Sequence, residues 1–344
     1  MSHVVVIGCG VVGAAIAYEL SQVPGLKISV LDKQQPATAA TGAALGVLMG
    51  VISHKIKGKA WQMRQASIQR YETLIPELEA ITKHHIPFNR QGILMLCFEE
   101  DLARWESLVK VRTSDGWQLE IWDAAKVKSR CPQIDCDAEG GTLSDRRLSA
   151  AVYSPQDRQV DPVSLTLALV EAAKRNGVSF HFGVTVEEYD LSTTTQHQPR
   201  VRQVKTKAVG VEKSPLIQDV DWLVVSAGLG SLETLHPLAG KVEQGEKIIP
   251  ESPSLPVPPS FHPSSRENST QFELGRMVDI RPVLGQAIQV KLKHPLGNPD
   301  FQPVITGNDV HIVPCSGGAR AAEYWVGATV EFPTDKGEIV AAPT

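Results

Sequence analysis

Apolar runs near the start of the chain predict a strand–helix–strand unit. Residues 3–7 form a β-branched run typical of a buried parallel strand, and residues 27–31 form a second run that ends at Asp32. Between them, residues 14–20 are apolar and favour a helix, which a following Pro-Gly pair ends. The chain up to Asp32 therefore predicts a βαβ unit.

Later patterns predict further helices. A one-sided apolar pattern predicts a long helix over residues 61–82, and we expect Pro76 to kink it. Residues 99–112 predict a second helix. Asp161 as an N-cap and Pro162 at the first helical position predict the start of a third.

Strand patterns fill much of the remaining chain. Strands are predicted at residues 92–98, 178–182, 221–226, 280–290, 309–314 and 324–331, with short antiparallel strands within 201–213. Because no helical pattern separates the last three segments, they indicate an antiparallel sheet. Residues 232–277 are rich in proline, serine and glutamate, and we expect a solvent-exposed, largely disordered insertion there.

The composition is that of an ordinary globular protein. The chain has 344 residues, of which 42% are hydrophobic and 21% charged, enough for about two domains with a sizeable core. Its net charge of −4 provides no broad basic surface for nucleic acid. The apolar N-terminal stretch lacks a basic start, and no apolar run reaches the length of a membrane span. We therefore expect a cytoplasmic protein that neither spans a membrane nor binds nucleic acid.

The cysteines indicate no strong site. There are five of them, scattered along the chain without a CxxC pair, so neither a zinc site nor a redox dithiol is predicted. Reduced thiols in the cytoplasm are expected. Cys131 and Cys136 lie close together in the sequence, and a disulfide or a metal role for them is the alternative.

The motif that carries chemistry is Gly8-x-Gly10-x-x-Gly13, between the first predicted strand and helix. Gly8 permits a tight turn, Gly10 lets the backbone approach a pyrophosphate, and Gly13 lets the helix pack on the sheet. The N–H groups and positive dipole end of the helix would face the phosphates. Asp32 can accept hydrogen bonds from two ribose hydroxyls. The pattern predicts dinucleotide binding; a glycine-rich turn in an unrelated α/β domain, with Asp32 as a solvated turn residue, is the alternative.

The glycine motif does not distinguish NAD from FAD. An NAD domain would normally continue at once with alternating strands and helices. Here a stretch of small apolar residues at 38–50 and then a long helix follow. An NAD(P)-dependent dehydrogenase is kept as an alternative.

The order of the motifs resembles the D-amino-acid oxidase family of FAD-dependent oxidoreductases, in its glycine-oxidase-like branch. The resemblance extends over nearly the whole chain. It is carried by the unit from Gly8 to Asp32 and by residues 41–46, 160–162, 221–230, 281–286, 311–314 and 326–331.

This resemblance implies the fold class. It implies an α/β protein in which a Rossmann-type FAD-binding domain is interleaved with an α+β substrate domain built on an antiparallel sheet. The FAD-binding domain is expected at residues 1–50 and 150–230. The substrate domain is expected at residues 51–149 and 278–344, with the insertion at 232–277 between the two.

The resemblance also implies FAD as the cofactor and the residues that contact it. Val11 and Val12 would lie against the pyrophosphate, and Asp32 and Lys33 would meet the adenosine ribose. The backbone of Val184 would pair with adenine. The other expected cofactor contacts are Gly8, Gly10, Gly13, Ala40, Thr41, Leu45, Gly46, Val47, Ala227 and Gly228. A flexible loop is the alternative for residues 38–50.

The reaction implied by the resemblance is oxidation of a small amine or amino acid of the glycine or D-amino acid type. A hydride passes to flavin N5 and the imine hydrolyses. His311 falls where glycine-oxidase-like sequences carry an aromatic residue beside the substrate, and is the candidate catalytic residue. A half-buried strand histidine is its alternative, and His54 is a second, weaker candidate. The electron acceptor, oxygen or another, is not indicated.

The pattern departs from the family at the C-terminal end. There the family adds a helix, a Gly-Leu-Arg-Pro motif whose arginine binds the substrate carboxylate, and a final glycine-rich segment. None of these follows residues 324–331 here, so the resemblance gives no substrate-binding arginine. We expect weaker FAD binding and lower stability than in a complete homologue. A truncated, non-catalytic nucleotide-binding remnant is the alternative function.

Overall fold

The computed structural model divides the chain into two compact units. Unit 1 contains Met1–Ala40 and Ala173–Arg281, and unit 2 contains Thr41–Ala172 and Pro282–Thr344. The structure describes residues 1–98, 102–136, 148–193, 199–209, 216–242, 280, 282–315 and 320–332. Unit 2 includes residues 41–50 and 150–172, which the sequence assigned by role to the FAD-binding domain. The predicted domains were defined by which residues contact FAD or substrate, and the two units are defined by compactness. The predicted domain boundaries therefore stay a prediction.

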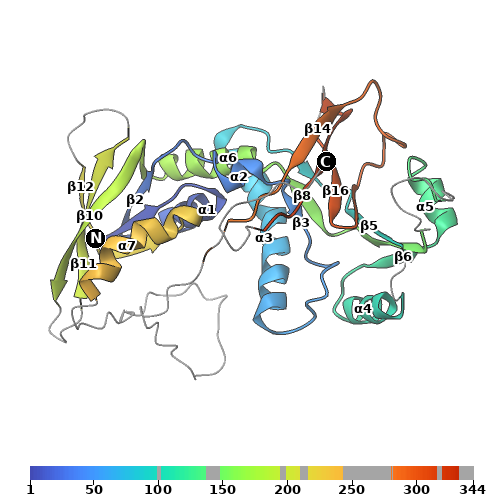
Figure 1. Cartoon of the computed structure of the whole chain (residues 1–344), viewed down its shortest axis with the longest axis horizontal. Coiled ribbons are helices and arrows are strands. Elements are labelled where there is room, and N and C mark those ends of the chain that lie inside the picture. The colour runs from blue at the N-terminus through green and yellow to red at the C-terminus, as the bar shows by residue number, and fades with distance from the viewer. Residues whose placement is uncertain are drawn as a thin grey trace. The chain divides into compact units, whose positions relative to one another are not determined.

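A parallel sheet forms the centre of unit 1. Its four strands stand in the order β13–β1–β2–β9, and neighbours are parallel. The strands are β1 (Ser2–Ile7), β2 (Leu26–Asp32), β9 (Ser179–Phe182) and β13 (Trp222–Val225). Helix α1 (Val11–Ser21) joins β1 to β2, which confirms the predicted βαβ unit (Figure 1). Val5 and Val6 of β1 are fully buried, as expected for a parallel sheet covered on both faces.

An antiparallel sheet lies beside the parallel one in unit 1. It consists of β10 (Val184–Thr193), β11 (Pro199–Ala208) and β12 (Ile217–Asp219), paired in that order. The sequence predicted strands only in the region of β11. The alternation of β10 is interrupted by a register shift between Val186 and Glu188, which hides its strand pattern.

The disordered insertion predicted at residues 232–277 is wrong at its start, where helix α7 (Ser231–Val242) lies. Residues 232–242 were assigned to that insertion, but they are helical. Leu235 and Leu238, three positions apart on one helix face, pack on the core of unit 1 and provide the reason. The rest of the predicted insertion, residues 243–277, lies outside the described residues.

A seven-stranded sheet forms the centre of unit 2, in the order β14–β17–β16–β15–β5–β7–β6. Its strands are β5 (Ile93–Cys97), β6 (Glu120–Trp122), β7 (Ala150–Ser154), β14 (Ala287–Lys291), β15 (Val304–Gly307), β16 (Val310–Pro314) and β17 (Glu323–Gly327). The expected antiparallel pairing is present, and one pair, β15 with β5, is parallel. β14 and β17 are shorter than the strands predicted at 280–290 and 324–331.

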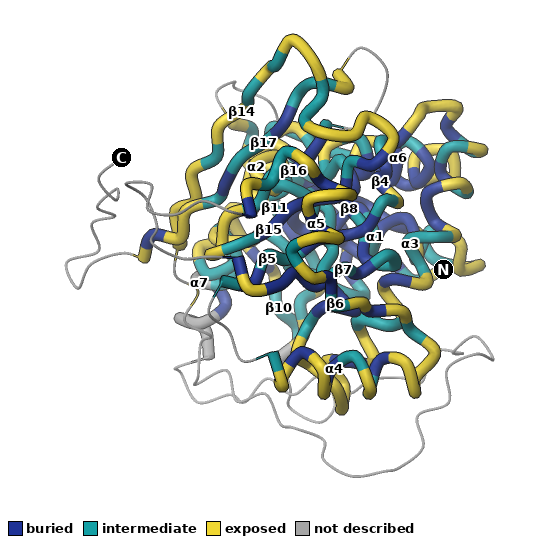
Figure 2. The backbone as a smooth tube through the Cα atoms, turned by 90° about the vertical axis from the view of Figure 1, so that its right-hand side faces the viewer, coloured by how far each residue is buried: buried dark blue, intermediate teal, exposed yellow. Residues whose placement is uncertain are grey.

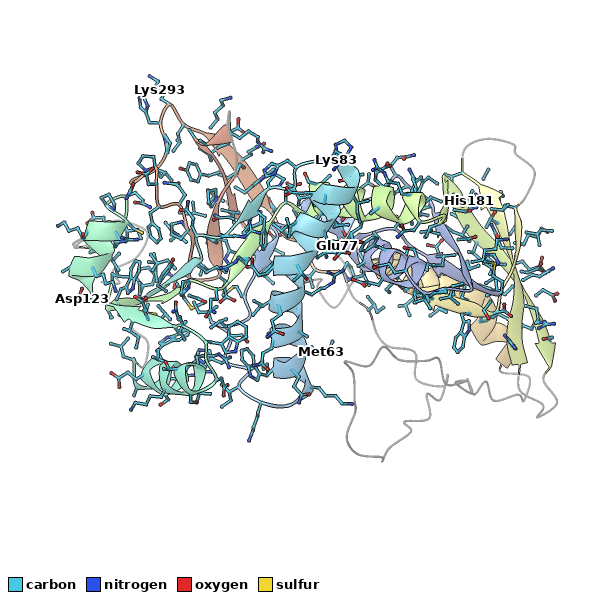
Figure 3. All side chains as sticks on the ribbon, turned by 180° about the vertical axis from the view of Figure 1, so that it is seen from behind. Met63, Glu77, Lys83, Asp123, His181 and Lys293 are labelled. Carbon is cyan, nitrogen blue, oxygen red and sulfur yellow. The ribbon has the colours of Figure 1, made fainter. Side chains whose placement is uncertain are left out.

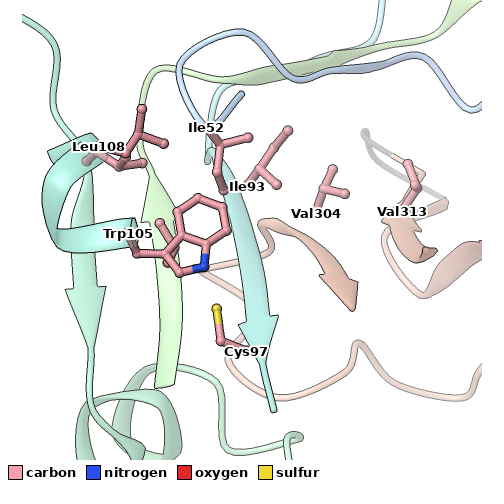
Figure 4. Packing of buried hydrophobic residues seen from close by; sticks show 9 residues of the cluster. Ile52, Ile93, Cys97, Trp105, Leu108, Val304 and Val313 are labelled. Atoms are coloured by element: carbon pink, nitrogen blue, oxygen red, sulfur yellow. The ribbon is translucent and has the colours of Figure 1, made fainter. Parts of the chain in front are cut away.

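Two buried clusters cover the two faces of this sheet. On one face, Ile93 packs in a cluster with Trp105 of helix α4 (Leu102–Ser114), as Figure 4 shows. On the other face, Leu94 packs in a cluster with helix α5 (Ala124–Arg130). Successive side chains of a strand point to opposite faces, so one strand serves both cores. Figure 2 shows α4 with buried positions alternating with exposed ones, as in an amphipathic helix.

Helix α3 (Gly58–Thr82) is the longest helix of the described chain. It begins at Gly58 rather than residue 61 and continues through Pro76. Figure 3 labels Met63 near its start and Glu77 in its second half. A salt bridge between Glu72 of this helix and Arg158 holds it to a small sheet described next.

Three short strands form a further small sheet, and a capped helix follows it in the chain. β3 (Val47–Leu48), β8 (Arg158–Val160) and β4 (Phe88–Asn89) form a sheet in that order. Helix α6 (Pro162–Arg175) starts where the sequence predicted. The Asp161 carboxylate accepts a hydrogen bond from the Ser164 N–H at 2.7 Å, which confirms the predicted N-cap.

Candidate functional site

The turn after β1 is tightly packed around its glycines. Gly8 has a φ of +101°, which favours glycine, and a Cβ there would lie 2.5 Å from the carbonyl oxygen of Ser226. A Cβ at Gly13 would lie 1.9 Å from the carbonyl oxygen of Gly8. Neither position can take a side chain unless the backbone moves. The backbone of the turn therefore lies in direct contact with the end of β13 and with α1.

The start of α1 is suited to an anionic group. Gly10 is its N-cap residue, and no side chain caps the helix with a hydrogen bond. The first turn, which begins with Val11, holds no acidic side chain, and Val12 is 59% exposed. The opening N–H groups of a helix have no acceptor within it and carry the positive end of the helix dipole. Negative charge at this end of α1 is therefore stabilised.

Asp32 lies at the end of β2 with part of its hydrogen-bonding capacity unused by the backbone. One carboxylate oxygen accepts from the Cys9 N–H at 2.6 Å, and the other accepts from the Gln34 N–H at 2.8 Å. Because an ionised carboxylate has about four acceptor sites, it can still accept from hydroxyl groups. The neighbouring Lys33 is exposed.

The Cys9 thiol lies inside this turn but is chemically inert. The side chain is fully buried. Burial, followed by the charge of Asp32, raises the pKa of the Cys9 thiol to about 12. The thiol therefore stays protonated near neutral pH, and it is neither a nucleophile nor a metal ligand.

The other predicted contacts of unit 1 lie at strand ends. Ala227 follows β13, and its Cα would lie 2.8 Å from a Cβ at Gly8. Gly228 begins a short helical turn with a φ of +57°. The structure thus brings the end of β13 to the glycine turn, where the order of the sheet reverses. Val184, at the start of β10, pairs with Ala208 in the sheet register.

The flavin segment, residues 40–47, contains the cofactor contacts predicted beside the flavin and is held against β8. Ala40 and Thr41 lie in the one-turn helix α2 (Ala40–Ala43), and Val47 lies in β3. Gly46 has a φ of +69°, and a Cβ there would lie 1.8 Å from the carbonyl oxygen of Val160. The Val160 N–H donates to Gly46 O at 3.0 Å, and the Gln159 side chain donates to Leu45 O at 3.3 Å. A glycine is therefore required where β3 meets β8.

His311 lies on β16 with an unused nitrogen. In the sheet register it pairs with Thr306 of β15 and Gly327 of β17. Its Nδ1 is buried and has no hydrogen-bond partner in the described part of the chain. Burial lowers the pKa of the His311 imidazole, so the ring is neutral at pH 7. The free nitrogen of a neutral ring can donate a hydrogen bond to a ligand or accept one from it, depending on the tautomer.

The predicted flavin segment packs on the same face of the seven-stranded sheet that carries His311. Leu45 and Val47 pack on the buried cluster that includes Val313, as does Met49 just after the flavin segment. Val313 and His311 are two positions apart on β16, so their side chains point to the same face. Within unit 2, the candidate catalytic histidine therefore lies on the sheet face on which the flavin segment packs.

His54, the second candidate, lies farther along the same segment. Its ring centroid is 4.4 Å from that of Trp105, with the planes tilted by 45°. Trp105 belongs to the cluster that packs on this face of the sheet. The contact gives His54 a packing role, and its chemical role is untested.

Two buried ionic residues near this segment were not predicted from the sequence. Asp157 and Arg112 are both completely buried, and both bind the backbone of residues 50–55. Asp157 follows a proline in a polar stretch, which is typical of a solvated turn. Arg112 ends the helix predicted over residues 99–112, and arginine side chains are seldom fully buried. Neither position carried a sequence signal for its burial.

Comparison with known proteins identifies the family. Residues 3–255 match the family described as FAD dependent oxidoreductase. The chain belongs to this family of FAD-dependent oxidoreductases. The cofactor of the family is FAD, and its members are oxidoreductases.

Curated relatives of this family member include longer proteins. The chain is 28% identical over 263 residues to the bifunctional protein ThiO/ThiG of Trichormus variabilis, covering 74% of this chain and 35% of that protein. It is 27% identical over 243 residues to hydrogen cyanide synthase subunit HcnC of Pseudomonas protegens, covering 60% of this chain and 54% of that subunit. The chain thus spans between a third and just over half of these relatives.

Solved structures share the fold of this FAD-dependent oxidoreductase. Glycine oxidase from Bacillus cereus superposes with a TM-score of 0.67 at 20% identity, over 97% of this chain and 73% of that one. L-proline dehydrogenase from P. horikoshii superposes with a TM-score of 0.66 at 17% identity, over 98% of this chain and 74% of that one. The predicted α/β fold class, with an FAD-binding and a substrate domain, is therefore confirmed.

Three further observations concern the chemistry of the described residues. The five cysteines are free thiols. Where side chains are described, no group of three or more His, Cys, Asp or Glu residues is arranged to hold a metal ion. Among the helices of the described ranges, none combines the length and the apolar character needed to cross a bilayer.

Proposed function

We propose that this FAD-dependent oxidoreductase oxidises a small amine or amino acid of the glycine or D-amino acid type. The observation that carries the proposal is the close-packed glycine turn at the start of α1 beside the Asp32 carboxylate, in a chain of this family. The likeness to a glycine oxidase fold supports the substrate class.

The residues of unit 1 fit the adenosine diphosphate part of FAD. The missing Cβ atoms of Gly8 and Gly13 keep the turn narrow, and the uncapped start of α1 favours a pyrophosphate beside Val11 and Val12. The open acceptor sites of Asp32 suit ribose hydroxyls. Further proposed contacts of this part are Gly10, Lys33, Val184, Ala227 and Gly228.

The flavin segment has small and apolar side chains, which suits a close approach of the flat flavin ring to its backbone. Leu45, Gly46 and Val47, after Ala40 and Thr41, would line the ribityl chain and the ring. The chemistry that a bound flavin supplies is acceptance of a hydride at N5 from the carbon that carries the amine. Leu45 and Val47 would orient the ring and exclude water from it.

His311 would act on the substrate. Its neutral ring presents an otherwise unused nitrogen on the face where the flavin segment packs. It would hydrogen-bond the substrate amine or carboxylate and so orient the reacting carbon. We propose this role for His311 and not proton abstraction, because hydride transfer requires no strong base on the protein.

The experiment that tests the function is a visible spectrum followed by substrate addition. The protein is mixed with FAD, passed through gel filtration and scanned, and we expect a flavin spectrum in the protein peak. Glycine, sarcosine and D-amino acids are then added without oxygen, and at least one should bleach the flavin. A protein that binds FAD but is bleached by no amine would overturn the substrate class. A protein that stays colourless and binds NADH would support the dehydrogenase alternative.

We also propose that the protein works in the cytoplasm. All five cysteines are free, and four of them are buried thiols, which suits a reducing compartment. Fractionation of cells that express a tagged chain tests this, and recovery in a secreted or membrane fraction would contradict it.

A further inference from the structure

Asp157 binds a run of backbone N–H groups in unit 2. It lies in the turn between β7 and β8, and its side chain is completely buried. One carboxylate oxygen accepts from the N–H groups of Gly50 and Val51, at 2.7 and 2.8 Å. The other oxygen accepts from the Ile52 N–H at 2.8 Å. Three consecutive amides therefore converge on one buried carboxylate.

Arg112 binds the carbonyl groups of the same segment. It lies in the last turn of α4 and is completely buried. Its Nε donates to Val51 O at 2.7 Å, and one terminal nitrogen donates to Ser53 O at 2.6 Å and to Lys55 O at 3.1 Å. The guanidinium also stacks 3.6 Å from the centroid of the Trp61 ring. The planar guanidinium is therefore held both by its hydrogen bonds and by stacking on the Trp61 ring.

The two side chains form a clamp on residues 50–55, with Asp157 on the amides and Arg112 on the carbonyls. A buried ion that loses its hydrogen-bond partners is strongly unfavourable. If residues 50–55 moved away, both ions would lose most of the partners described above at once. The clamp therefore keeps this segment in one conformation, although it belongs to no helix or strand.

The clamp is continuous with the strand that holds the flavin segment. Asp157 directly precedes β8, and β8 pairs with β3 through Val47 and Gln159. One short stretch, residues 157–160, therefore contacts the chain from Leu45 to Ile52. A displacement of residues 50–52 would be transmitted to the flavin segment through only the two positions between them, Leu48 and Met49.

We propose that Asp157 and Arg112 are positioning residues that hold residues 45–55 in the FAD-binding conformation before FAD arrives. The inference rests on the proposed cofactor role of Leu45, Gly46 and Val47. Neither side chain needs to touch the cofactor. Because the segment is already ordered, FAD binding would not have to supply the free energy needed to order it.

Limited proteolysis of the FAD-free protein tests the clamp itself. Lys55, Lys57 and Lys59 are exposed and offer trypsin sites at the end of the clamped segment. Arg112→Met keeps an unbranched, flexible side chain without the guanidinium donors, and Asp157→Asn keeps the shape of the aspartate side chain. We expect cleavage after these lysines to be about tenfold faster in both variants than in wild type. Equal rates would overturn the clamp.

A matched control variant lies on α3. Arg70→Met removes an ion pair with Glu77 at 2.7 Å in the same unit, and it removes none of the hydrogen bonds from Asp157 and Arg112 to residues 50–55. Its cleavage pattern should match wild type. Arg112→Lys, which restores the charge but not the fork of donors, should cleave at an intermediate rate.

Hydrogen exchange in wild type keeps the test independent of folding in the variants. The amides of Gly50, Val51 and Ile52 should exchange at least about tenfold more slowly than those of an ordinary loop in the FAD-free protein. Fast exchange at all three would overturn the clamp without any substitution.

FAD affinity tests the link to the cofactor. The dissociation constant, measured by calorimetry, should rise about tenfold or more in Arg112→Met and stay unchanged in Arg70→Met. Faster proteolysis with unchanged FAD affinity would overturn the positioning role. If wild type binds no FAD, the proposed function fails, while proteolysis and exchange still decide whether the clamp exists.

Discussion

The glycine turn of unit 1 and residues 45–52 of unit 2 are both candidate cofactor segments, but different contacts hold them. In the turn, missing side chains allow the backbone at Gly8 and Gly13 to pack closely. Residues 45–52 are held by polar groups far away in the sequence, such as Asp157, which is 107 positions from Gly50. The first segment thus depends on the absence of side chains within it, and the second depends also on polar side chains elsewhere in unit 2.

This difference predicts where each segment is vulnerable. The turn should fail when a side chain is added within it. The second segment should also fail when a distant polar partner is removed, as described for Asp157 and Arg112. The following substitutions compare the two, from the largest expected effect to the smallest.

Gly13→Ala and Gly46→Ala should have the largest effects. The added Cβ would lie 1.9 Å from Gly8 O and 1.8 Å from Val160 O respectively, so backbone must move in each case. We expect each to lower the free energy of unfolding by about 2–4 kcal/mol, measured by urea denaturation.

A control glycine separates steric contact from backbone strain in these variants. Gly25 has a φ of +84° and nothing within 4 Å of an added Cβ. Gly25→Ala should cost only about 1–2 kcal/mol. If Gly46→Ala costs no more than Gly25→Ala, the close approach of β3 to β8 is not the reason for glycine at 46.

Asp32→Asn should separate binding from folding. The half-buried carboxylate has acceptor sites left for a ligand, and the variant keeps one oxygen for the Cys9 N–H. We expect the FAD dissociation constant to rise about tenfold to a hundredfold, since hydrogen bonds to a charged group are lost. Calorimetry measures it, and Asp219→Asn on β12 is the control. A variant with unchanged affinity would argue against a ribose role for Asp32.

Asp161→Ala should have a smaller effect, on stability alone. α6 carries a side-chain cap from Asp161, whereas the N-cap residue of α1, Gly10, provides none. Loss of the cap should lower the free energy of unfolding by about 1 kcal/mol and leave FAD affinity unchanged. Urea denaturation measures the free energy of unfolding, and calorimetry measures FAD affinity. A loss of FAD affinity in this variant would show that α6 is not merely structural.

The smallest expected effect is the contribution of His3, in unit 1, to the loss of stability in acid. Its Nε2 lies 2.9 Å from Ser29 Oγ, and burial lowers the pKa of His3 below its ordinary value of 6.5. The unfolded chain therefore takes up this proton at a higher pH than the folded protein does. The contribution is fully present above pH 6.5 and declines as the pH falls below it. Urea denaturation at pH 7 and about pH 5 gives the free energy of unfolding, which should decline less in His3→Gln than in wild type. An equal decline in both proteins would assign the pH dependence to other groups.

Local features were predictable from the sequence in both units. The βαβ unit, the cap at Asp161 and the long helix α3 follow from short-range patterns of apolar, capping and breaking residues. The strand at β10 was missed because a register shift breaks its alternation. The start of α7 was missed because the proline-rich composition downstream masked two leucines that pack on the core.

Long-range features of the candidate site were not predictable in this way. The glycine turn is a local motif, so its residues were found. The burial of Asp157 and Arg112 depends on contacts with residues 50–55, which are distant in sequence and irregular in structure. A single sequence contains no periodicity that reports such pairing. The roles of His311 and the flavin segment came from family resemblance and stay predictions.

The strand order of unit 1 also means that the parallel sheet cannot be completed until late in translation. β1 is made first, yet one of its two neighbours is β13, whose last residue is Val225. At common translation rates, roughly 10–45 s pass before that neighbour has been synthesised. During this time one edge of an apolar β1 has no native partner. The nascent chain is therefore expected to need a chaperone, or rapid cover by α1, until the ribosome has passed β13.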